Sequence, residues 1–147
     1  MIKNSIKKLN HLIDNVAKKI NEISDEELST KPFPNKWSKK EIIGHLIDSA
    51  VNNHSRIIRA QYEDTPEITY DQNNWNKLNF YQSIKSNQLI SFWKMYNKHL
   101  LQIINRIPVE SLMNKIKVGN QILTLEFIIV DYVEHLEYHL NQIIEDK

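Results

Sequence analysis

The feature that most limits the fold of this chain is its shortage of helix-breaking residues. Only 2 glycines and 4 prolines occur among 147 residues, so long regular elements are expected. Apolar residues recur with a helical period in four long segments, at about 2–22, 38–62, 80–106 and 124–145. Four such helices with mostly antiparallel neighbours form a four-helix bundle. The chain is therefore predicted to be all-α, with a single bundle domain over 1–147.

Polar residues and prolines mark where several of these segments begin and end. Ser38 and Glu41 form a capping box, in which each side chain can bond the backbone N–H of the other residue. Ser24 can cap a further short turn of helix. Residues 30–37 contain two prolines and cannot be helical throughout. Residues 63–77 hold a proline and a cluster of Asp and Asn, which predicts a long polar loop.

A short hairpin is expected ahead of the last helix. Apolar residues alternate over 114–125 on both sides of Gly119-Asn120, which is typical of two strands joined by a two-residue turn. The predicted architecture is therefore four helices with one short β-hairpin before the last of them.

The composition excludes several classes of function. The formal net charge is +1, which gives no electrostatic footprint for nucleic acid or an anionic membrane. Cysteine is absent, so disulfides, thiolate zinc sites and a thiol nucleophile are excluded. No segment approaches the ~18 apolar residues of a membrane span, and the N-terminal segment lacks the apolar core of a signal peptide. We therefore expect a cytoplasmic protein with a small-molecule substrate and no nucleic-acid or membrane partner.

Two histidines near the end of the chain have the spacing of metal ligands on one helix. His135 and His139 are four residues apart, which places them ~40° apart in azimuth and one turn apart along a helix. Both lie on the border between the apolar and solvent-facing sides of the last helix, and Asp131 and Gln142 share that border. The pair alone is a weak signal of a metal site.

The second helix carries a matching polar stripe. His45, Ser49, Asn52 and Arg56 follow one border of its apolar side at i, i+4, i+7 and i+11. In a bundle, two such stripes can converge on one pocket between helices. Three histidines without a fourth protein ligand would form a site of the catalytic type, for Zn²⁺, Ni²⁺ or a similar ion. Polar rims are also a general feature of bundle helices, so periodicity alone leaves both interpretations open.

Other metal-site patterns are excluded. A zincin needs a glutamate directly after the first histidine, and that position is Leu136. A di-iron bundle needs Glu-x-x-His pairs, whereas Glu134 is adjacent to His135. His54 lies nine residues after His45, so it points to the opposite side of the helix, and we expect a partly buried structural histidine. His99 is a less favoured neighbour of the site.

Three stretches of the chain together resemble the DinB/YfiT-like superfamily of four-helix bundles. Residues 36–60, KWSKKEIIGHLIDSAVNNHSRIIRA, are similar to its second helix, with a W-S-x-x-E-x-x-x-H-L-x-D-S signature. HLEYHLNQI matches its C-terminal H-x-x-x-H-x-x-Q-I pattern, and residues 63–75 resemble a loop of the YfiT-like branch. The resemblance covers nearly the whole chain. It implies one divalent ion, usually zinc or nickel, bound by His45, His135 and His139.

The resemblance also implies a chemistry. Members of the superfamily are described as metal-dependent hydrolases, and related members transfer bacillithiol, mycothiol or glutathione to electrophiles, or isomerise maleylpyruvate with a thiol cofactor. We expect a transferase of a low-molecular-weight thiol, because a bound ion would lower the thiol's pKa. One alternative is a hydrolase of amide or ester bonds, with Asp131 as its base. The other is a non-enzymatic metal-binding module. The resemblance also makes a homodimer possible.

Roles are expected for the polar residues beside the histidines. Asn52 and Arg56 would line the substrate side, with Arg56 available to pair with a carboxylate during catalysis. Trp75 would either cover the pocket or pin its loop to the core. Gln142 and Ser49 are candidates for orienting the ligand imidazoles.

Overall fold

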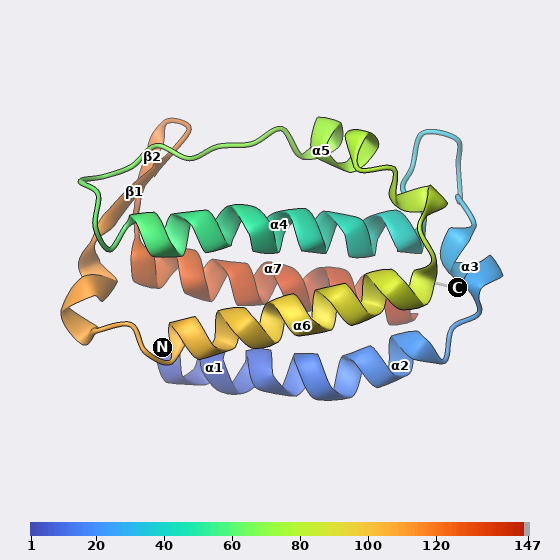
Figure 1. Cartoon of the computed structure of the whole chain (residues 1–147), viewed down its shortest axis with the longest axis horizontal. Coiled ribbons are helices and arrows are strands. Elements are labelled where there is room, and N and C mark those ends of the chain that lie inside the picture. Colours follow the sequence, from blue (N-terminus) through green and yellow to red (C-terminus); the bar gives the residue numbers. More distant parts are fainter. Residues whose placement is uncertain (146–147) are drawn as a thin grey trace.

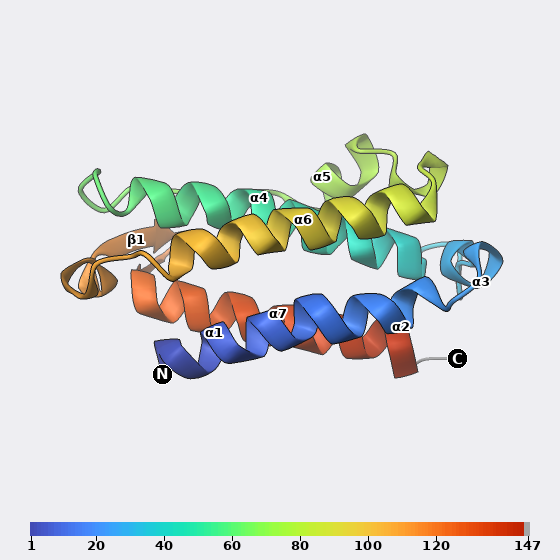
Figure 2. The ribbon, with the colours of Figure 1, turned by 60° about the horizontal axis from the view of Figure 1, so that its bottom comes forward.

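Four long helical rods run side by side in the computed structural model, which describes residues 1–145 (Figures 1 and 2). The first rod is formed by α1, a π-helical turn and α2, and the others are α4, α6 and α7. The α-helices are α1 (Ile2–His11), α2 (Ala17–Asn21), α3 (Asp25–Ser29), α4 (Lys39–Arg59), α5 (Gln72–Leu78), α6 (Ser86–Ile104) and α7 (Leu125–Glu145). The other elements are the π turn Leu12–Val16, the 3₁₀ turns Tyr81–Ser83 and Val109–Met113, and the strands β1 (Lys115–Val118) and β2 (Gln121–Thr124). The predicted four-helix bundle with a hairpin before its last helix is confirmed.

The order of the rods differs from a simple antiparallel bundle. Helix α4 packs against α6 and α7, and the first rod packs against the same two helices. Helices α4 and α6 both run from the α3 end of the bundle towards the hairpin (Figure 1). Helices α1 and α7 are also parallel to each other, and both run in the opposite direction. The expectation of mostly antiparallel neighbours is therefore wrong. Its cause is the long connection 60–85, which returns the chain along the whole bundle before α6 begins.

The first rod contains one irregular turn that the sequence did not predict. The segment expected as one helix at 2–22 is interrupted by the π turn Leu12–Val16, whose buried side chains keep the rod against the core. An apolar period cannot distinguish a regular turn from one with a single extra residue, so sequence reasoning missed it.

The capping box that begins α4 is confirmed. The Ser38 side chain accepts a hydrogen bond from the Glu41 N–H at 3.1 Å, and the Ser38 N–H donates to Glu41 Oε1 at 3.0 Å. A serine also caps α3, where Ser24 Oγ accepts from Glu27 N–H at 3.1 Å. Helix α4 ends at Arg59, three residues before the predicted end at 62.

Two predicted boundaries are wrong between α4 and α6. The segment 63–77, expected as a loop, contains most of α5. Asp71 caps this helix by accepting from the Asn74 N–H at 3.0 Å, so an Asp taken as a helix breaker is in fact a helix start. Helix α6 begins at Ser86 and not near 80, because Phe80 has a left-handed backbone with φ 55° that turns the chain.

The hairpin is confirmed where it was expected. Strands β1 and β2 are antiparallel, and the pair Val118–Gln121 closes a turn in which Gly119 has φ +60°. The segment after α4 is attached to its edge, since the Ile68 N–H donates to the Lys117 carbonyl at 3.0 Å. Within residues 1–145, no helix has the length and apolar character to cross a membrane.

Candidate metal centre

The three predicted histidines come together between α4 and α7. His45, His135 and His139 each offer a ring nitrogen, and these atoms lie within 4.8 Å of one another. The Nε2 atoms of His135 and His139 are 3.1 Å apart. The ring centroid of His45 lies 5.2 Å from the ring centroid of His135 and 5.0 Å from that of His139. His45 lies near the start of α4 and the pair lies in the second half of α7, so the antiparallel packing of these two helices brings them together. The described residues add no Asp, Glu or Cys to this group.

The arrangement fits a single divalent ion. Two nitrogens that each lie about 2.0–2.1 Å from one zinc ion, at tetrahedral to octahedral angles, are about 2.8–3.4 Å apart. The observed 3.1 Å lies in this interval. His45 Nδ1 is also buried without a hydrogen-bond partner among the residues described. Without a metal, the two Nε2 atoms can share a hydrogen bond donated by His135.

One side chain fixes the tautomer of a candidate ligand. His139 Nδ1 lies 2.9 Å from Gln142 Oε1. An amide oxygen only accepts, so His139 donates its Nδ1 proton and keeps the lone pair on Nε2, which faces the centre. This contact is of the kind that would orient a ligand imidazole, and that role of Gln142 stays a prediction.

Burial favours the neutral form of two of these imidazoles, His45 and His135. It lowers the pKa of His45 to about 4, with further lowering from the nearby His135 and His139. Burial and His139 also lower the pKa of His135, while the charge of Asp131 opposes that shift. Metal binding requires neutral imidazoles, so the low pKa values favour ligation at neutral pH.

Aromatic rings enclose two of the histidines. The Trp37 ring lies on His45, with centroids 5.0 Å apart and planes at 35°. The Tyr138 ring meets His139 edge to face at 5.1 Å. Both rings restrict the orientations that the imidazoles can take.

The polar stripe of α4 continues beneath the segment 63–71. The Arg56 Nε–H and an Nη2–H donate to the Ile68 carbonyl at 3.2 and 3.0 Å, and an Nη1–H donates to Asn53 Oδ1 at 3.2 Å. Asn52 Nδ2 donates to the Asp48 carbonyl of its own helix at 2.9 Å. Arg56 thus anchors the loop, and three of its five N–H groups are already bonded within the protein.

The other expected site residues lie close to this anchor. Ser49 Oγ accepts from Asn53 Nδ2 at 3.2 Å. Trp75 meets Tyr70 edge to face at 5.7 Å, so its ring helps to hold the segment that leads into α5. Asp131 is exposed one turn before His135 on α7. Burial lowers the pKa of both His135 and Arg56, and the charge of Asp131 opposes that lowering.

Two further histidines, His54 on α4 and His99 on α6, form a separate pair. His54 Nδ1 lies 2.8 Å from the Tyr96 hydroxyl, and the His99 ring meets His54 edge to face at 5.5 Å. His54 is half-buried, as expected. His99 is thus placed against His54 and is not one of the three converging histidines.

Sequence reasoning missed a buried carboxyl group one turn from His45. Asp48 is 1% exposed, and its Oδ1 accepts from the Tyr81 hydroxyl at 2.5 Å and from Asn79 Nδ2 at 3.1 Å. Its Oδ2 has no partner among the described residues. Burial raises the pKa of Asp48 to about 6, against the lowering effect of the Tyr81 hydrogen bond.

Gly44 makes room for this contact. A Cβ atom at Gly44 would lie 2.1 Å from the nearest atom of the Tyr81 ring, so only glycine lets that ring lie on α4. An isolated glycine inside a predicted helix is the signal that could have revealed the close approach.

A cavity of about 600 Å³ lies beside the histidines. Most of its wall comes from residues 27–42, that is, from α3, the following loop and the start of α4. The lining residues are Glu27, Thr30, Pro32, Phe33, Lys36, Trp37, Lys39, Ile42, His139 and Gln142. The substrate side was expected near Asn52, Arg56 and Trp75, and none of these three lines this cavity.

Comparison with known proteins places the chain in a family. The family model of the DinB superfamily matches residues 8–143. A proposed metal-dependent hydrolase of Bacillus licheniformis is 35% identical over 71 residues, which are 48% of this chain and 39% of that protein. A similar protein of Oceanobacillus iheyensis is 25% identical over 71 residues, 41% of its length. The chain thus spans about two-fifths of these curated relatives.

Solved structures share the fold. YfiT of Bacillus subtilis, described as a probable metal-dependent hydrolase with an unusual four-helix bundle topology, superposes with a TM-score of 0.88 at 20% identity, over 98% of this chain and 84% of that chain. A variant of the mycothiol-dependent maleylpyruvate isomerase superposes with a TM-score of 0.80 at 8% identity, over 97% and 60% of the two chains. At these identities the likeness establishes the fold alone.

Proposed function

This chain belongs to the DinB superfamily, and we propose that it is a metal-dependent enzyme whose three histidines bind one divalent ion, zinc or nickel. One observation carries the proposal: ring nitrogens of His45, His135 and His139 converge within 4.8 Å from two different helices. The relatives named as metal-dependent hydrolases support it.

We propose transfer of a low-molecular-weight thiol to an electrophile as the reaction. When bound, the ion would lower the pKa of a thiol or a water molecule at its open positions. An imidazole ligates a metal in its neutral form, so three histidine ligands would leave the charge of a divalent ion uncompensated and favour an anionic partner such as a thiolate. The chain has no cysteine that would compete for the ion. The fold shared with an isomerase that depends on mycothiol also supports a thiol as co-substrate.

The side chains around the histidines would position them and shape the site. Gln142 holds the His139 tautomer that presents Nε2 to the centre. Trp37 covers one face of His45 and limits access of water to it. In this proposal the part of the site beneath the segment 63–71 is shaped by Asn52 and Arg56 on α4 and by Trp75 on α5. Arg56 contributes its positive charge.

Hydrolysis of an amide or ester is the second candidate. It needs a general base, and Asp131 lies close enough for its charge to raise the pKa of His135. Asp131 is exposed and is not part of the converging group, which makes this candidate the weaker one.

The two reactions are distinguished by turnover assays on zinc-loaded and nickel-loaded protein. Bacillithiol, mycothiol and glutathione are each mixed with a haloalkyl electrophile; a C–S bond forms, halide leaves and the thiol proton passes to solvent. We expect metal-dependent conjugation that is lost in His135→Ala and retained in His99→Ala. No metal-dependent conjugation with any thiol would refute the transferase. Ester or amide turnover that Asp131→Ala abolishes would instead establish the hydrolase.

A further inference from the structure

The cavity beside the histidines combines an apolar wall with positive charge. Pro32, Phe33, Trp37 and Ile42 supply the apolar surface, and His139 and Gln142 form the side that adjoins the candidate metal centre. A molecule in this cavity therefore directly reaches one of the three histidines, His139. Cavities of this kind, mostly apolar with a few placed polar groups, are typical of small-molecule sites.

Two aromatic rings are available to a flat apolar group. Trp37 lines the cavity and also lies 5.0 Å from the His45 ring, so its indole is shared between the cavity wall and the candidate metal centre. Phe33 lines the cavity and is 59% exposed, so its ring is accessible to a ligand. Covering Phe33 with an apolar group would remove this surface from water.

The charges that line the cavity select an anion. Its wall holds Lys36, Lys39 and Glu27, and Lys39 Nζ lies 3.5 Å from Glu27 Oε1. Within residues 1–145, Lys36 has no carboxylate at ion-pair distance, and its Nζ lies 5.6 Å from the centre of the Phe33 ring. The ammonium group of Lys36 thus lies over the Phe33 ring, and no carboxylate of the described residues is at ion-pair distance to compensate its charge. A ligand with a carboxylate attached to a flat apolar group would contact both the Lys36 ammonium group and the aromatic wall of the cavity.

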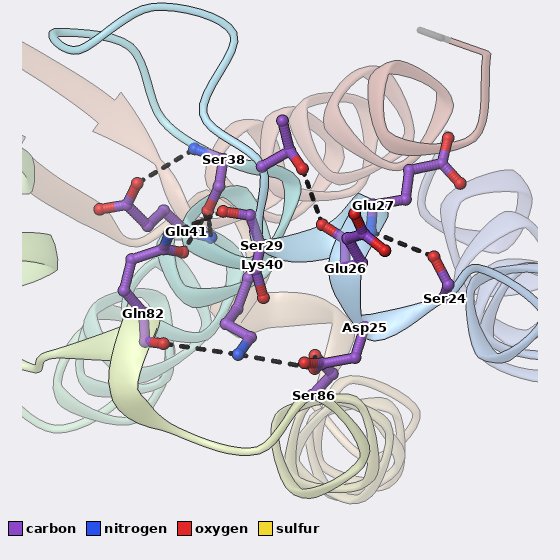
Figure 3. Close-up of polar contacts among 11 residues, drawn as sticks. Ser24, Asp25, Glu26, Glu27, Ser29, Ser38, Lys40, Glu41, Gln82 and Ser86 are labelled. Atoms are coloured by element: carbon purple, nitrogen blue, oxygen red, sulfur yellow. Dashed lines mark hydrogen bonds and ion pairs between the residues drawn. The ribbon is translucent and has the colours of Figure 1, made fainter.

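The loop that forms this wall is held at both of its ends. The Gln82 side chain donates to the Ser29 carbonyl at 2.8 Å and accepts from Ser38 Oγ at 2.5 Å, so one amide joins the two ends of the loop (Figure 3). Lys31 adds an ion pair with Glu41 at 2.9 Å. A wall fixed in this way requires little ordering when a ligand binds.

A second contact fixes α3 at the same place. Lys40 Nζ lies 3.5 Å from the Gln82 carbonyl oxygen and 3.7 Å from Asp25 Oδ1, and Asp25 accepts a short hydrogen bond from Ser86 Oγ (Figure 3). These contacts join α3, α4 and the start of α6. The cavity therefore has a preformed wall.

We propose that this cavity binds the apolar, carboxylate-bearing part of the substrate, with Trp37 and Phe33 against its flat apolar body and Lys36 against its carboxylate. As a substrate subsite the cavity depends on the proposed metal-dependent function, because the histidines would act on the part of the molecule that extends beyond it. Binding of the carboxylate by Lys36 does not need the ion and is tested without it.

The test compares two probes of nearly equal shape, phenylacetate and phenylacetamide, on metal-free protein kept in chelator. Binding is followed by two-dimensional NMR, with the indole N–H of Trp37 as the reporter for the cavity. We expect phenylacetate to bind about three- to fivefold more tightly than phenylacetamide, as for an exposed ion pair. Lys36→Gln is expected to remove this preference, and Lys36→Glu to reverse it. Lys98→Gln, at an exposed lysine of α6, should leave it unchanged.

Several results would overturn the proposal. Equal binding of the two probes, no shift of the Trp37 signal, or an unchanged preference in Lys36→Gln would each do so. A preference that appears only after zinc is added, and is equal in Lys36→Gln, would assign the carboxylate to the ion and not to Lys36. Failure of the conjugation assay with an intact Lys36-dependent preference would refute the thiol chemistry and leave the anion subsite in place.

Discussion

Replacement of Asp48 by asparagine should change how stability depends on pH. Burial raises the pKa of this carboxyl group from 3.8 to about 6, so the folded protein holds the proton more tightly than the unfolded chain. Between these two pH values the native state binds more protons, and the free energy of unfolding therefore falls as pH rises. In the wild-type protein, the stabilising contribution of the retained Asp48 proton to the free energy of unfolding should be complete below pH 4 and lost above pH 6.

The size of the effect follows from the pKa. A change of one pKa unit is worth about 1.4 kcal/mol, so the rise to about 6 corresponds to at most about 3 kcal/mol. In Asp48→Asn, the new side chain would still accept a hydrogen bond from the Tyr81 hydroxyl but would have no proton to lose. Its amide N–H₂ would occupy the position of Oδ2, which has no partner among the described residues, and that cost is the same at every pH.

The assay is urea unfolding of metal-free wild type and Asp48→Asn between pH 4.5 and pH 7. The difference in unfolding free energy should shift in favour of the variant by about 1–3 kcal/mol across this interval. Asp14→Asn, at an exposed carboxylate of the first rod, is the matched control and should show a constant difference. A constant difference for Asp48→Asn as well would refute the assignment of a buried, proton-retaining carboxyl group.

Three further predictions concern residues around the site. Gly44→Ala would force the Tyr81 ring away from α4, and we expect a loss of about 1–3 kcal/mol in urea unfolding; an unchanged midpoint would contradict the close approach. Ser38→Ala would remove a helix cap, with an expected loss of about 1 kcal/mol by the same assay. Gln142→Ala should weaken zinc binding about 10- to 100-fold in competition with a chelator, whereas its exposed neighbour Asn141→Ala should not.

The sequence predicted the parts of the fold that depend on local patterns. The apolar period identified the long helices, and the Ser38 capping box located the start of α4 within one residue. The convergence of His45 with His135 and His139 could also be predicted, because azimuth on two helices places all three on borders of the apolar faces and the family resemblance singles out the same three residues.

Features that depend on contacts between distant segments could not be predicted from the sequence. Asp71 is typical of a loop until the helix that follows it is known to form. The burial of Asp48 depends on Tyr81, which follows it by 33 residues, and the cavity wall depends on Gln82 joining Ser29 to Ser38. A substrate side inferred along α4 alone therefore pointed to Arg56, whereas the observed cavity is formed mostly by residues before His45, together with His139 and Gln142.

The most direct test of the central claim is the metal content of purified protein, measured by inductively coupled plasma mass spectrometry. Wild type, His135→Ala and His99→Ala are prepared side by side with zinc and nickel in the medium. The arrangement of His45, His135 and His139 predicts close to one ion for each chain in wild type and His99→Ala, and far less in His135→Ala. Equal metal content in all three proteins would contradict it.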